Sequence, residues 1–154
     1  MRGYYFPLIA GIALVASTFL PWVIVGDTTL RGIPNVPALW VAGLGVIAVV
    51  LAALSIITRK NSRHPLLVAG LAALGILVLS ARVLPRSMGE RAASLAQAAE
   101  IVEGTPAAAP PDGVIGVGIY IGIAAAAVIA LFGLTIVVKR AAQPYAVASA
   151  DDDV

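Results

Sequence analysis

The sequence predicts an all-α membrane protein: a bundle of four transmembrane helices, with one extra amphipathic helix in the loop between spans three and four. Composition is the first reason, because 60% of the 154 residues are hydrophobic and only 12% are charged. Soluble domains usually carry about a quarter charged residues. The second reason is four long uncharged stretches, and the third is a helical apolar stripe in the segment that separates the last two of them.

Each uncharged stretch has the length of a membrane crossing. A helix needs roughly 20 apolar residues to cross a hydrocarbon core of about 30 Å. Four apolar helices in a soluble protein would need amphipathic helices to cover them, and little of the chain is left for that purpose. The predicted spans are residues 5–25, 37–57, 66–84 and 115–138; the third is the shortest and has Arg82 near its end.

The first stretch is interpreted as a permanent span. Its apolar run continues to Val25, which is too long for the 7–15-residue core of a cleaved signal peptide. Pro21 lies one turn from its end, and Trp22 is expected to anchor the helix at the membrane interface. Residues 26–36 are then expected to form a short outer loop with several turns.

Basic residues predict the orientation, because short cytoplasmic loops are enriched in Lys and Arg. One side of the predicted bundle carries six basic residues, which lie in the loop between spans two and three and near both chain ends, whereas the other side carries four. We therefore expect both termini to be cytoplasmic, in a bacterial inner (plasma) membrane. Residues 1–140 form the transmembrane domain in this prediction, and residues 141–154 form a flexible acidic tail. The basic residues of the inner side are Arg2, Arg59, Lys60, Arg63, Lys139 and Arg140, and those of the outer side are Arg31, Arg82, Arg86 and Arg91.

The segment after the third span predicts a separate outer helix over residues 88–103. Pro85 is expected to end or kink the span, and Ser87 with Glu90 has the spacing of a capping box. Gly104 supplies the stop, and a Pro-rich linker follows. The stripe either covers the outer ends of the bundle or docks a partner protein, and its members are Met88, Ala92, Leu95, Ala99 and Val102.

Small residues in the fourth span predict a close helix contact. They recur every fourth residue, and small side chains permit backbones to approach within a membrane. The sequence leaves open whether the contacting helix is internal or belongs to a partner. The four residues are Gly118, Gly122, Ala126 and Ala130. Arg82 and Arg86 flank the outer end of span three, where they are expected either to reach lipid headgroups or to pair with an acidic group, such as Asp27 or one on a partner.

No pattern in the sequence indicates a catalytic, cofactor-binding or metal site. The central parts of the spans carry no charged residue, which disfavours ion-coupled transporters. The only histidine is His64, there is no cysteine, and Glu100 and Glu103 lie on a polar face. Hydroxyl groups in the spans are expected to bond the backbone of the preceding turn. These belong to Ser17, Thr18, Ser55, Ser80, Tyr120 and Thr135.

These observations favour a non-catalytic membrane subunit or scaffold that packs against larger integral membrane proteins or against copies of itself. The alternative is a small oligomeric transporter or channel without charges inside the membrane. We expect membrane lipid as a partner, no nucleic acid and no enzymatic activity. A lipid, quinone or pigment held by apolar contacts would leave no ionisable trace in the sequence and stays compatible with it.

Overall fold

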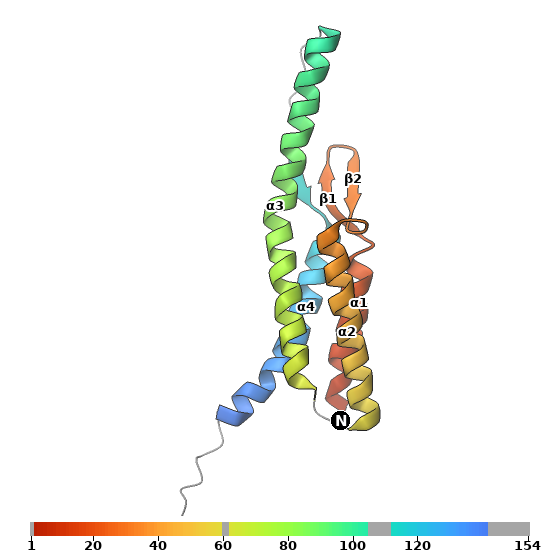
Figure 1. Cartoon of the computed structure of the whole chain (residues 1–154), viewed down its shortest axis with the longest axis vertical. Coiled ribbons are helices and arrows are strands. Elements are labelled where there is room, and N and C mark those ends of the chain that lie inside the picture. The colour runs from red at the N-terminus through yellow and green to blue at the C-terminus, as the bar shows by residue number, and fades with distance from the viewer. Residues whose placement is uncertain (1, 60–61, 105–111, 142–154) are drawn as a thin grey trace, which may run out of the picture.

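The computed structural model describes residues 2–59, 62–104 and 112–141, which form a long helical bundle with a small sheet at one end (Figure 1). The predicted tail, apart from Ala141, and most of the predicted linker lie outside the described residues. In chain order the elements are η1 (Arg2–Tyr4), α1 (Tyr5–Ser17), β1 (Pro21–Val25), β2 (Thr28–Arg31), α2 (Val36–Thr58), α3 (Arg63–Glu103), β3 (Gly113–Ile115) and α4 (Val117–Ala141).

Among the described residues, the three helices α2, α3 and α4 are long and apolar enough to cross a membrane. The predicted span 37–57 falls within α2. Helix α1 is apolar but has 13 residues, about 20 Å of helix, and is therefore shorter than the roughly 30 Å hydrocarbon core. It lies against α2 and α4 along its length (Figure 1).

The prediction of one helix over residues 5–25 is wrong, because α1 ends at Ser17 and residues 21–25 form strand β1. After Ser17 the backbone tightens into three-residue turns, with Thr18 N–H donating to Val15 O and Leu20 N–H to Ser17 O. Pro21 then has no N–H with which to continue a helix. The segment after strand β2 also forms a hydrogen bond with the end of α1, since Ile33 N–H donates to Thr18 O at 2.8 Å.

The expected loop of residues 26–36 is instead largely a β-hairpin. Strands β1 and β2 pair antiparallel through the two-residue connection Gly26–Asp27, and Gly26 has a positive φ of 56°. Glycine at the first position of such a connection accommodates the twist of a hairpin. On its other side β1 pairs antiparallel with β3, so the sheet order is β2-β1-β3.

The third span and the outer helix are one element, which corrects the prediction of separate helices over 66–84 and 88–103. Helix α3 runs for 41 residues, about 62 Å, with Pro85 inside it. The capping box does not form, because the Ser87 hydroxyl donates to Leu84 O at 3.1 Å within the continuous helix. The loss of one backbone hydrogen bond at Pro85 is tolerated, as it often is in long apolar helices.

The fourth span begins later than predicted, because Ile115 belongs to β3 and α4 starts at Val117. Gly116 N–H donates to Trp22 O at 2.7 Å, which joins the start of α4 to β1. The core beneath this junction is apolar and fully buried. Its largest members include Trp22, Leu14, Leu66, Leu77, Ile119 and Ile129.

Candidate functional site

The small residues of α4 lie inside this chain's own bundle. Gly118, Gly122, Ala126 and Ala130 are all buried. A Cβ atom on Gly118 would lie 2.7 Å from Trp22 Cδ1, and one on Gly122 would lie 3.0 Å from both Leu77 Cδ2 and Ser17 Oγ. The stripe therefore faces α1, β1 and α3 within one chain.

Closer backbone contacts occur at glycines that the sequence did not single out as a set. A Cβ on Gly70 of α3 would lie 2.6 Å from Ala130 N, so α3 and α4 meet at this point with no room for a methyl group. A Cβ on Gly133 would lie 2.6 Å from Leu67 Cα. On the opposite side of the bundle, Gly11 and Gly45 let α1 and α2 approach each other. Spacing alone could not separate these positions from other glycines in a Gly- and Ala-rich chain.

We call residues 88–103 the α3 extension; it projects past the sheet instead of folding over the bundle (Figure 1). Its apolar stripe has two parts. Met88, Ala92 and Leu95 line a groove of about 340 Å³ together with Val25 and Thr28 of the hairpin. Ala99 and Val102 lie farther out, and Val102 is 84% exposed.

Arg82 and Arg86 are both exposed on α3 near the level of the sheet. Within the described part of the chain neither forms an ion pair, so the alternative of pairing with Asp27 does not occur. Arg86 lines an open pocket with Glu90 and Asp112, beside the point where β3 passes Pro85. Their exposure is compatible with contact to lipid headgroups.

Most hydroxyls in the helices return to the backbone as expected. Ser17 Oγ donates to Leu14 O at 2.7 Å, Ser55 Oγ to Leu51 O at 2.8 Å, and Thr135 Oγ1 to Phe132 O at 2.7 Å. Tyr120 and Ser80 are the exceptions among the described residues, because neither hydroxyl has a hydrogen-bond partner there. The Tyr120 side chain is 60% exposed, whereas that of Ser80 is only 5% exposed.

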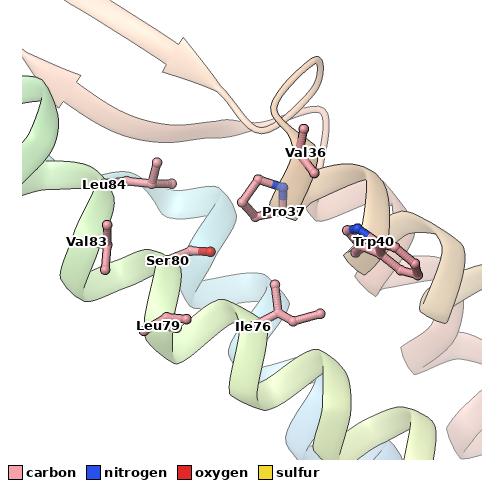
Figure 2. A pocket seen from close by; sticks show the side chains of 8 residues that line it. All are labelled: Val36, Pro37, Trp40, Ile76, Leu79, Ser80, Val83 and Leu84. Atoms are coloured by element: carbon pink, nitrogen blue, oxygen red, sulfur yellow. The ribbon is translucent and has the colours of Figure 1, made fainter.

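The Ser80 hydroxyl faces an apolar cleft between the start of α2 and the outer half of α3 (Figure 2). The cleft has a volume of about 290 Å³. It opens sideways, because Trp40 is 66% exposed and three of its aliphatic residues are exposed as well. The lining residues are Val36, Pro37, Trp40, Ile76, Leu79, Ser80, Val83 and Leu84.

The remaining ionisable residues do not gather into a reactive constellation in the part of the chain that the structure describes. His64 is exposed in the first turn of α3, and Glu100 is exposed on the α3 extension. No group of three His, Cys, Asp or Glu side chains could hold a metal ion among these residues. At the His64 end of the bundle, Arg63 instead lies over the Phe132 ring at 5.4 Å from its centroid.

Comparisons with known proteins found no match: no family model, no curated protein and no solved structure matches the chain.

Proposed function

We propose that the protein is a non-catalytic accessory subunit of the bacterial inner membrane, and that it docks a partner membrane protein through the α3 extension. The single observation that carries this proposal is the exposure of apolar side chains on an extension that projects beyond its own bundle. Leu95 is 72% exposed and Val102 is 84% exposed, and both lie on the same face of α3. Exposed apolar patches outside the membrane mark sites of association.

The proposal places four helices across the membrane with both termini in the cytoplasm. Helix α1 and η1 together reach about 26 Å, which brings the N-terminus close to the far boundary of the hydrocarbon. The sheet must lie outside the hydrocarbon, because open strand edges are not tolerated within it. Ser62 N–H donates to the Tyr4 hydroxyl at 3.2 Å, which joins the N-terminus to the basic end of the bundle.

A subunit is favoured over the alternative of a small channel by the packing of the bundle. Its interior in the described residues is filled by apolar side chains such as Leu14, Leu77 and Ile129. The buried hydroxyls of Ser17 and Ser55 are bonded to their own helices. No continuous polar path follows from this arrangement, and a channel built from it would have to lie between copies of the chain.

Purification from native membranes in mild detergent tests the proposal. We expect the wild-type chain to be recovered with a partner protein in a fixed ratio. The double variant Leu95→Asp/Val102→Asp should lose that partner, because two carboxylates would be desolvated in the contact. Mass measurement of the purified complex gives the readout.

The matched control is Ser94→Asp/Gln97→Asp, which adds the same charge to other faces of the extension. This variant should keep the partner. Recovery of the wild type as a lone monomer, or equal retention of the partner by both double variants, would overturn the proposal. Flux of ions across liposomes that contain only this protein would support the channel instead.

A further inference from the structure

The cleft between α2 and α3 joins an apolar wall to one polar group that has no partner. Ser80 is 95% buried, its hydroxyl points into the cleft, and none of the other described residues bonds it (Figure 2). Serines of apolar helices ordinarily donate to the preceding turn, as Ser55 does to Leu51 O. The free hydroxyl and the space before it therefore fit a ligand that brings its own hydrogen-bonding atom.

The position of Ser80 narrows the chemistry of that ligand. It lies 17 residues after Arg63, about 26 Å along α3 from the basic end, and only two residues before Arg82. This depth is close to the outer boundary of a hydrocarbon core of about 30 Å. Diacyl lipids carry their ester carbonyls at this boundary.

The open side of the cleft indicates where the ligand enters. Val36, Leu79 and Trp40 are each exposed by more than half, so the cleft faces the surrounding lipid and not the sheet. Its apolar walls continue to Ile76 toward the middle of the membrane, and its volume of about 290 Å³ holds several methylene groups. An acyl chain can lie along this wall while its ester carbonyl meets the Ser80 hydroxyl.

We propose that this cleft is a binding site for one acyl chain of a diacyl membrane lipid, with the Ser80 hydroxyl donating to the ester carbonyl. Arg82 and Arg86 lie just beyond Ser80 along α3 and are exposed on other faces of the helix, so neither lines the cleft. The site rests on insertion of α2 and α3 in a membrane and is independent of the docking role of the α3 extension.

Native mass spectrometry of the full chain in detergent tests this inference. Two phospholipids with the same headgroup and chain length are titrated, one ester-linked and one ether-linked, because the ether lipid lacks the carbonyl. We expect the wild type to bind the ester lipid about threefold to tenfold more tightly, the range that one net hydrogen bond supplies. Ser80→Ala should bind both lipids equally, and Ser80→Thr should restore the preference.

The matched control is Ser55→Ala, which removes a buried hydroxyl that is already bonded to its own helix. This variant should keep the ester preference, and thermal unfolding in detergent checks that each variant is folded. Equal affinity of the wild type for ester and ether lipids would overturn the proposal. So would an unchanged preference in Ser80→Ala, or displacement of the ester lipid by a quinone that binds more tightly and depends on Ser80.

Discussion

The indole N–H of Trp22 donates to the Ser17 carbonyl at 3.0 Å, and both side chains are fully buried. This bond ties the first residues of the sheet to the last residue of α1. A Cβ on Gly118 would meet both partners, since it would lie 2.7 Å from Trp22 Cδ1 and 2.8 Å from Ser17 O. One tryptophan thus fastens α1, β1 and α4 at the same point.

Replacing Trp22 should destabilise the protein although no functional group is removed from its surface. Trp22→Phe loses the hydrogen bond and leaves a gap beside Gly118, so we expect a loss of about 1–3 kcal/mol in the free energy of unfolding. Thermal or denaturant unfolding in detergent measures it. Trp40→Phe is the control, because Trp40 is exposed and should change stability by less than about 0.5 kcal/mol. Equal effects of the two changes would contradict the buried position of Trp22.

Two glycines of α3 should respond oppositely to a single methyl group. In Gly70→Ala the new Cβ would lie 2.6 Å from Ala130 N, and we expect a loss of about 1–3 kcal/mol from overpacking. In Gly75→Ala nothing lies within 4 Å of the new atom. This second variant should be neutral or more stable by up to about 1 kcal/mol, because alanine favours a helix over glycine. Unfolding midpoints compare the pair directly, and a destabilised Gly75→Ala with a tolerated Gly70→Ala would refute the α3–α4 contact.

Single cysteines should report the sidedness of the two ends of the bundle, because the chain has no cysteine of its own. Thr28→Cys in the hairpin should react with an impermeant maleimide in intact cells, since Thr28 is exposed at the sheet end. Thr58→Cys at the other end of α2 should react only after the membrane is opened. Labelling of both positions from the same side would exclude a crossing by α2.

A distance across Pro85 tests the continuity of α3. Spin labels on Arg82→Cys and Gln97→Cys should be separated by about 22 Å of helix axis, because the two positions are 15 residue steps apart in one continuous helix. The distance should be unchanged when Pro85→Ala is added. A much shorter or very broad distribution would indicate that the α3 extension folds back over the bundle.

The high apolar content of the chain indicated a helical membrane protein, because helices with apolar surfaces on all sides must contact lipid or other apolar helices. Residues 37–57 are recognisable as a helix long and apolar enough to cross a membrane, since they are apolar all round and need no specific partner to be helical there. The stripe of Gly118, Gly122, Ala126 and Ala130 was visible for a similar reason, as small residues at a fixed step permit approach whatever the neighbour is.

The first span illustrates what local sequence could not settle. Residues 21–25 are apolar and β-branched apart from Pro21 and Trp22, so they suit a strand as well as the end of a membrane helix. Their state was decided by pairing with residues 28–31 and with residues 113–115, which lie about ninety positions further along the chain. Pro85 shows the opposite: the sequence predicted a break in the helix at this residue, but α3 continues through it.

By itself, then, the sequence determined that this chain is mostly helical and apolar enough for a membrane, because hydrophobicity and helical period are local properties. Only the tertiary structure decided where Trp22 lies, which glycines separate the helices, and that Ser80 alone among the buried serines has no hydrogen-bond partner in the described residues. These features depend on contacts between segments distant in the chain. The sequence cannot show whether a serine hydroxyl in a helix donates to the preceding turn or faces a cleft.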